Sequence, residues 1–452
     1  MTAQLSDIQA GSIDRFQINS NTGTAREGRS RDLSAGVSEF RYYESVLSNS
    51  ITATAVISET GFVTDGNELS TAAGTIDGLP IRGGERTDII VKDDHNNVLS
   101  PRNGLYVNRV RNADPGSQKD VYWLDFTSAE CFSNEKTRVT RRYDGKISQH
   151  VENILTQVLQ TNNRIDIDPT ALDYNFIGNT RKPYRVCTWL ASKAVPEVAV
   201  NGKNSLGATA GYLFYQTRNS FHFKSIDVLL QQNPIRKYIF NTGGKVRGYD
   251  DNIINYTIDR DVDLKESLTL GVYNNRSNFF DPVAFNYVVR DYNVEDQKDK
   301  IGMAGRNFAA EMAAPDFTNS PSRMMTHVLD NGVLPQGINS QEQLENWKNR
   351  PQSPNFDAPK AMVQSIMRYN ELFTIQTNIT VPGDFTIKAG DVVECSFQEL
   401  DGSPNKGVNR ESSGIYMVAH VCHKVTPSDT LSSLGLVRDS YRQRPSSEPL
   451  LF

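Results

Sequence analysis

The residue types with the clearest chemical potential lie together towards the C-terminal end of the sequence. His420, Cys422 and His423 are all ligand types that zinc accepts. On a strand, side chains alternate between two faces, so His420 and Cys422 share one face while His423 points away. Because no fourth ligand lies nearby in the sequence, we predict that these are core and strand-edge residues and that no metal is bound.

Two further segments begin like functional motifs and then depart from them. The alternating aspartates of 259–263 resemble the start of a calcium loop, but Leu264 replaces the required glycine and Leu270 the bidentate glutamate. The segment 207–211 resembles a nucleophile elbow with threonine in place of serine, yet it precedes the predicted strand 212–217 instead of following one. No glycine-rich phosphate loop follows a predicted strand. We therefore expect neither a calcium site nor a nucleotide site.

A pair of carboxylates is the remaining route to catalysis. Glycoside hydrolases bring two such groups together in space, and this chain has 53 acidic residues. Their spacing singles out no pair. The prediction is that the protein is not an enzyme and uses no cofactor.

Length and charge predict a folded chain of several domains. With 452 residues the chain exceeds the usual size of one domain, so about three packing units are expected. Its 48 basic and 53 acidic residues give a net charge of −5, which lacks the basic excess of a nucleic-acid-binding protein. The densest basic stretch, Lys136–Arg142, is interpreted as a solvated surface.

The cysteines and the N-terminal segment predict synthesis in a reducing cytoplasm. The four cysteines are scattered, without the paired spacing of a zinc ribbon or a disulfide framework. The first residues lack the basic and apolar regions of a signal peptide. No apolar run approaches the roughly 18–20 residues that a membrane span needs.

The elements that would position functional side chains are mostly strands. From 51 to 58, apolar and polar residues alternate with a period of two and many are β-branched, which is typical of a half-buried strand. Short strands without intervening helices favour an antiparallel barrel or sandwich. Further strands are predicted at 88–91, 105–110, 121–126, 374–381, 391–397, 415–421 and 431–437.

A different pattern marks residues 131–211. Apolar residues between Ile147 and Leu159 recur at helical spacing, and a second short helix is predicted over 184–193. A clear hairpin follows, with strands at 212–217 and 221–224. We predict a separate α/β unit over 131–211, followed by this hairpin.

The two strand-rich regions share an internal repeat. Ile81–Glu85 and Ile387–Asp391 have the same order of apolar, basic, small, glycine and acidic residues. Further along, Gly104–Val107 is matched by Gly414–Met417. Glycine supplies the backbone freedom that a tight turn between strands requires. The matching order indicates a duplicated barrel, and the alternative is a chance match between two β-regions.

Several segments, in the same order, also resemble a known family. They are Tyr42–Leu47, Leu79–Glu85, Ala210–Asp227, Met367–Phe373, Val381–Phe385, Ala419–His423 and Leu436–Ser440. Together they resemble the central baseplate hub protein of T-even-type contractile phages, in the version of marine cyanobacterial phages. The likeness covers residues 38–440, and its specificity rests on the joint order because none of the segments is a catalytic signature.

The resemblance implies a homotrimer in which each subunit contributes two tail-tube-like barrels. Three subunits then form a ring of six similar units, which adapts a three-fold spike to a six-fold tube. The implied partners are further copies of this chain, the central spike protein, tail tube proteins and baseplate wedge proteins. DNA is implied as passing cargo only, without membrane insertion. The implied location is the tail baseplate of the virion, assembled in the cytoplasm of a host bacterium.

The predicted fold class is mainly β with α+β insertions. It comprises two tail-tube-like antiparallel β-barrels per chain plus smaller α/β domains. The predicted parts are an N-terminal arm at 1–37 that is ordered only against a partner, a first barrel at 38–130, α/β accessory domains at 131–211 and 249–357, a second barrel at 212–248 and 358–440, and an extended C-terminal tail at 441–452.

The predicted interface residues are the two repeated turns and the apolar tip of the tail. They are Arg82, Gly83, Gly84, Glu85, Lys388, Gly390, Asp391, Leu450, Leu451 and Phe452. Two other functions stay open at this point: a tail-associated cell-wall hydrolase and a glycan-binding tail module. In the second, exposed aromatics such as Tyr212 and Phe214 would stack on sugars, although aromatics on such a hairpin are more often core residues.

Overall fold

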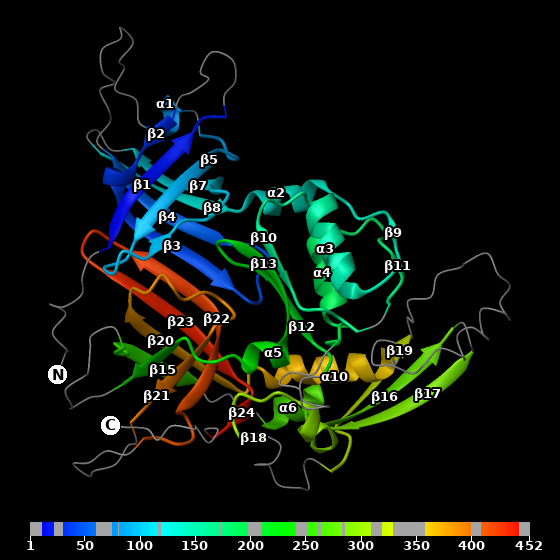
Figure 1. Cartoon of the computed structure of the whole chain (residues 1–452). Helices are drawn as coiled ribbons and strands as arrows, with labels where there is room; N and C mark the ends of the chain where they lie inside the picture. The colour runs from blue at the N-terminus through cyan, green and yellow to red at the C-terminus, as the bar shows by residue number, and fades with distance from the viewer. Residues whose placement is uncertain are drawn as a thin grey trace.

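Strands dominate the structure (Figure 1). The computed structural model describes residues 11–21, 30–59, 75–79, 81–115, 119–171, 173–197, 209–240, 251–259, 264–282, 285–308, 319–328, 358–398 and 408–442. The expected mainly β class is confirmed. None of the helices among these residues is long and apolar enough to cross a membrane.

Fourteen strands form one large, mostly antiparallel sheet. Its main path runs β15-β20-β23-β22-β3-β4-β8-β7-β5-β1-β2, while β21 pairs with β22, β14 with β21, and β6 with β5. The strands are β1 (Ser12–Asn19), β2 (Ser30–Asp32), β3 (Val37–Ser45), β4 (Thr52–Glu59), β5 (Arg86–Lys92), β6 (Val98–Leu99), β7 (Leu105–Pro115), β8 (Asp120–Thr127), β14 (Arg236–Ile239), β15 (Asn255–Asp259), β20 (Ile375–Pro382), β21 (Val392–Ser396), β22 (Gly414–Val425) and β23 (Thr430–Arg438).

Among the described strands, no sheet closes on itself. The two halves of the chain join where β22 pairs with β3, from His420 opposite Ser45 to Val425 opposite Phe40. The first residues of β22 pair with β21 and the later ones with β3. Because β22 belongs to the C-terminal half and β3 to the N-terminal half, their backbone hydrogen bonds join the two halves into one continuous sheet. The two closed barrels that the sequence predicts are not seen.

Each half keeps its own apolar core. In β4 the side chains of Ala53, Ala55 and Ile57 are buried and alternate with more exposed ones, which confirms the predicted period of two. They belong to the core of the N-terminal half. The C-terminal half buries a separate set that includes Ile379 and Leu434. The large sheet therefore covers two separate apolar cores.

The backbone ladders of the two halves repeat each other. Four strands lie in the order β4-β8-β7-β5 in one half and β20-β23-β22-β21 in the other. The Gly84 N–H donates to the Val107 carbonyl (2.7 Å), and the Val107 N–H donates to the carbonyl of the residue after Gly84 (2.9 Å). In the second half, the Gly390 N–H donates to the Val418 carbonyl and the Val418 N–H donates to the Asp391 carbonyl, both at 2.8 Å. The duplication is therefore present in the hydrogen bonds as well as in the sequence.

A bulge follows at the matching position in both halves. The register shifts between Val107 and Arg109 in β7, and between Val418 and His420 in β22. Arg109 therefore corresponds to His420. On this alignment β3, which pairs with β4, corresponds to β15, which pairs with β20.

Part of the predicted N-terminal arm is a strand of the sheet. β1 pairs antiparallel with β5, and its side chains Phe16 and Ile18 are fully buried in the first core. The expectation that residues 1–37 are ordered only against a partner is wrong for this strand. Two apolar side chains on one face of a strand suffice to anchor it within its own chain. Residues 1–10 and 22–29 lie outside the described residues.

A smaller α/β unit lies beside the junction of the two halves (Figure 1). The predicted helix is present as α3 and the π-helical η3, and the predicted hairpin as β12 and β13. The sequence assigned this hairpin to the second barrel, but β13 pairs in parallel with β10 instead. Its Phe221 and Phe223 are buried in the core of the α/β unit. The elements here are α2 (Ala129–Lys136), β9 (Arg142–Tyr143), α3 (Ile147–Asn153), η3 (Ile154–Val158), β10 (Arg164–Ile167), β11 (Phe176–Ile177), α4 (Pro183–Ala191), β12 (Tyr212–Gln216), β13 (Ser220–Ser225) and α5 (Ile226–Leu230).

A third group of elements surrounds a three-stranded sheet of β17, β16 and β19. Val363 and Met367 of α10 pack into its core. The sequence placed residues 255–259 in this accessory region, but they form β15 at the edge of the large sheet. The remaining elements are η2 (Ser34–Gly36), α1 (Thr75–Gly78), α6 (Leu264–Leu270), β16 (Asn274–Asp281), β17 (Asn286–Asn293), η5 (Glu295–Lys300), β18 (Asn307–Phe308), β19 (Arg323–Val328), α10 (Ala358–Glu371) and β24 (Ser440–Tyr441).

Candidate functional site

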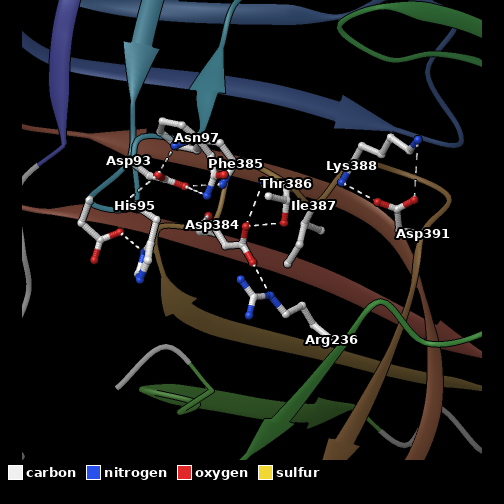
Figure 2. Close-up of polar contacts among 12 residues, drawn as sticks. Asp93, His95, Asn97, Arg236, Asp384, Phe385, Thr386, Ile387, Lys388 and Asp391 are labelled. Carbon is white, nitrogen blue, oxygen red and sulfur yellow. Dashed lines mark hydrogen bonds and ion pairs between the residues drawn. The ribbon is translucent and has the colours of Figure 1, made fainter. Parts of the chain in front are cut away.

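The candidate functional site is the junction loop, defined as residues 383–391 between β20 and β21 (Figure 2). Its buried side chains enter three different cores. Phe385 lies in the core of the N-terminal half, Ile387 in that of the C-terminal half, and Ala389 in a third core shared with the β12 strand. The packing units of the chain therefore meet at this loop.

Asp93 ties the first half to the junction loop. Its carboxylate accepts hydrogen bonds from the N–H groups of His95 (3.0 Å) and Asn97 (2.7 Å), from the Asn97 side-chain amide (2.9 Å), and from the Phe385 N–H (3.1 Å) (Figure 2). The ligand atoms of Asp93, Asp94 and His95 lie within 4.8 Å of one another, as metal ligands do. However, four donors already occupy the roughly four lone-pair sites of the Asp93 carboxylate. The Asp93 carboxylate therefore serves as a turn brace.

Glu44 on β3 joins the loop to the α/β unit. Its buried carboxylate accepts hydrogen bonds from the Tyr42 hydroxyl (2.9 Å), the Arg218 N–H (2.7 Å) and the Ala389 N–H (3.1 Å). The guanidinium of Arg218, in the turn between β12 and β13, donates to the carbonyl of Phe385. A single carboxylate thus holds three segments that lie far apart in the sequence.

Two further groups fix the loop from the C-terminal half. The Arg236 guanidinium donates to the Asp384 carboxylate at 2.9 Å. His423 is buried, with Nε2 3.2 Å from the Ile387 carbonyl and Nδ1 2.8 Å from the Ser432 hydroxyl. Burial lowers the pKa of His423 to about 4, so its ring is neutral at pH 7.

Acid should weaken this junction through His423. Because the pKa of His423 in the folded protein is below its ordinary value of 6.5, the stabilisation is complete above pH 6.5 and is lost as pH falls towards 4. Between pH 7 and 4.5 the free energy of unfolding of the native protein should fall by about 2 kcal/mol more than that of a His423→Gln variant. Burial raises the pKa of Asp391 to about 6 and of Glu371 to about 8. Because a raised carboxyl pKa stabilises the folded protein as the pH falls, both groups act against the effect of His423.

The informative quantity is therefore the difference between native and variant protein in chemical denaturation at each pH. Parallel stability curves for the two proteins would contradict the assignment of the acid-sensitive group to His423.

The two repeated turns, which the sequence predicted as interface residues, are braced in the same way. The Glu85 carboxylate accepts hydrogen bonds from the N–H groups of Arg82 (2.8 Å) and Gly83 (2.9 Å). The Asp391 carboxylate accepts one from the Lys388 N–H (3.0 Å). Both acids are buried, so their first role is to hold the turn within the chain.

The glycines of these turns have backbone conformations that other residues rarely adopt. Gly84 has φ +84° and Gly390 has φ +88°, and Gly83 is also in the left-handed region at +107°. Arg82 is exposed at the surface of its turn. The predicted interface residues Leu450, Leu451 and Phe452 lie outside the described residues.

The zinc-like trio divides as predicted from strand geometry. His423 is buried towards the junction loop, whereas His420 lies on the exposed face of β22, where its ring covers Gly435. Cys422 is partly exposed and pairs across the sheet with Tyr43. His423 is a core residue as predicted, but β22 is paired on both sides here, so the prediction of strand-edge residues is wrong for His420 and Cys422.

A buried charge cluster was not found from the sequence. The side chain of Arg368 on α10 is fully buried and lies 2.8 Å from Asp227, 3.0 Å from Asp439 and 3.5 Å from Glu371. Burial raises the pKa of Glu371 to about 8, so this carboxyl is protonated at neutral pH. All four groups are shielded from solvent, and the cluster links α10, α5 and the end of β23. The spacing of Arg368 and Glu371 by three residues was its only local signal.

The fold and its junction define a β-rich structural unit with an internal duplication. The chain shares this fold with the 43 kDa tail protein of prophage MuSo2 from Shewanella oneidensis, with a TM-score of 0.50, 9% identity, and coverage of 94% of this chain and 98% of that one. It also shares it with the tail protein from Neisseria meningitidis MC58, with a TM-score of 0.51, 10% identity, and coverage of 95% and 96%. No protein-family model and no curated protein matches the sequence. The expected likeness to phage tail proteins is confirmed at the level of the fold.

Proposed function

We propose that this chain is a structural subunit of the baseplate hub of a contractile-tailed phage. The observation that carries the proposal is the duplicated ladder, in which matching glycines, bulges and strand orders recur in the two halves. A trimer of such a chain presents six similar units to a six-fold tail tube. The fold shared over nearly the whole chain with two tail proteins supports the same role.

In this proposal the two halves act as tail-tube-like barrels around a central channel. The trimer joins the tube proteins on one side to the central spike on the other, and wedge proteins of the baseplate surround it. DNA passes through the channel as cargo.

Charge pairing on the solvent face of the sheet supports a channel of this kind. Arg41 lies 2.6 Å from Glu39, and Arg111 lies 2.7 Å from Asp125, on positions that alternate with buried core residues. A surface whose basic groups are neutralised offers few free cations to phosphates, so DNA slides past without tight binding.

The glycan-binding alternative loses its main observation. Tyr212 is 0% and Phe214 4% exposed, and both pack in the core of the α/β unit. Aromatic side chains buried in this way are not free to stack on a sugar. The hydrolase alternative rests on no arrangement that the described residues show, and a peptidoglycan zymogram tests it directly.

The mass of the purified protein tests the hub proposal. We expect light scattering over a concentration series to give the mass of three chains at high concentration, and negative-stain images to show rings around a central hole. Interfaces completed by partners weaken the free assembly, so spike and tube proteins are added in parallel. A monomer without rings even beside these proteins, or clearing of peptidoglycan, would overturn the proposal.

A further inference from the structure

Among the described strands, β22 has partners along both sides, whereas its counterpart β7 lacks one along part of its second side. β22 pairs with β23 along one side, and on the other with β21 up to Met417 and with β3 from His420 onward. β7 pairs with β8 along one side, with a second register shift between Arg111 and Asp114 that β22 lacks, and with β5 only at Leu105 and Tyr106. Beyond its bulge, from Arg109, no described strand pairs with the second side of β7.

The strand β15 leaves the complementary side open. Its counterpart β3 lies between β4 and β22. β15 pairs with β20 on one side, and no described strand pairs with the other side of 255–259. Unpaired N–H and C=O groups along a strand edge form hydrogen bonds readily with another strand. Within the described residues, one edge of β7 and one edge of β15 are therefore open, and their counterparts β22 and β3 pair with each other at the internal junction.

The repeat of four strands gives the register in which an edge like that of β7 would pair with an edge like that of β15. The cross-sheet row Arg109, Asp125, Thr54 and Arg41 in the first half corresponds to the row His420, Gly435, Asn378 and Thr257 in the second. Two residues further along each outer strand, Arg111 corresponds to Cys422 and Asp259 to Tyr43. Within the chain, Cys422 and Tyr43 lie directly opposite each other.

We infer that β7 of one copy pairs antiparallel with β15 of a second copy, with Arg111 opposite Asp259. This inference rests on the proposed hub function. The same contact repeats head to tail and closes after three copies, so the sheet continues around the ring. At each such boundary the internal Cys422–Tyr43 pair is replaced by residues of opposite charge, which favours the pairing of different copies.

The repeated turns then have different neighbours. At the internal junction, the turn 388–391 receives β3, whose Glu44 accepts a hydrogen bond from Ala389. The turn 82–85 occupies the equivalent place beside β7, where its Gly84 bonds to Val107. The exposed Arg82 therefore lies at the boundary between copies, while Lys388 lies at the boundary within one chain.

Thiol cross-linking of the full chain tests the register. Arg111→Cys combined with Asp259→Cys should react with a short bis-maleimide to give two-chain and three-chain bands on denaturing gels. Tyr43→Cys is the matched control, because it places a thiol opposite the native Cys422 and should cross-link within one chain only. Arg111→Cys with Asn255→Cys is the off-register control, because four residues along a strand separate the thiols by about 13 Å.

A charge change gives an independent readout if the cysteine variant folds poorly. Asp259→Lys should raise the concentration needed for the trimer at least tenfold, while Asn286→Lys, at an exposed position of β17 away from both edges, should leave it unchanged. Trimers that form normally but give no intermolecular band would overturn this pairing and leave the hub proposal standing. Bands that extend beyond three chains would overturn closure at three copies. Absence of any trimer would count against both.

Discussion

Replacing Arg368 with methionine should lower the free energy of unfolding by about 3–5 kcal/mol. The change keeps most of the volume but leaves the carboxylates of Asp227 and Asp439 buried without their cation. A buried charge without a partner of opposite charge destabilises the folded protein. Asp227 also accepts a hydrogen bond from the Gly302 N–H at 3.1 Å, so its displacement would disturb this segment too. A loss of this size is a large part of the roughly 5–15 kcal/mol that stabilises a typical domain. Guanidinium denaturation followed by circular dichroism measures it.

The matched control breaks an ion pair at the surface. Arg276 lies 2.6 Å from Asp291, but the two side chains are 43% and 53% exposed. Arg276→Met should therefore cost less than about 1 kcal/mol. Equal losses for the two variants would show that the Arg368 cluster does not stabilise the chain through buried charge.

Replacing Gly390 with alanine should cost about 2–5 kcal/mol. The positive φ of +88° is strained for any residue with a side chain, which accounts for about 1–2 kcal/mol. The new Cβ would also lie 2.1 Å from the Tyr215 hydroxyl oxygen, and Tyr215 is only 2% exposed in the third core. Overpacking of this kind adds about 1–3 kcal/mol. Thermal and chemical unfolding both report the change.

The internal repeat supplies the control for this variant. Gly84 has almost the same φ, +84°, but among the described residues a Cβ there would meet only the Asn21 side-chain amide, at 3.3 Å. Gly84→Ala should therefore show the backbone strain without the core clash, at about 1–2 kcal/mol. If Gly390→Ala and Gly84→Ala lower the free energy of unfolding equally, the close packing of Tyr215 against the junction loop does not contribute to the loss.

Local sequence patterns predicted the elements that depend on near neighbours. The alternation at 51–58, the helical spacing from Ile147 to Leu159 and the 212–224 hairpin are all present as expected. The two repeated turns also have the same conformation in the structure. In each, a glycine with positive φ is followed by a buried acid that accepts a backbone hydrogen bond from within the same turn, so five residues specify it. The resemblance to tail proteins rested on the order of such segments, and the fold bears it out.

Only the tertiary structure decided where these elements pair. β1 is mostly polar, with Phe16 and Ile18 as its buried side chains, so the local pattern did not separate it from an arm. The partner of the hairpin is β10, some 50 residues before it, and the sequence pattern of 212–224 is compatible with either sheet.

The junction itself depends on contacts across hundreds of residues. The pairing of β22 with β3, the bond from Ala389 to Glu44 and the burial of Arg368 each join segments that no local period relates. Asp227 and Asp439 reach Arg368 from distant segments, so the spacing of Arg368 and Glu371 was the only local signal of this buried cluster. The sequence thus determined the repeated units of this protein, and tertiary packing decided how one chain joins them. The physical reason is that the edge of a strand can form hydrogen bonds with any strand that the fold brings beside it.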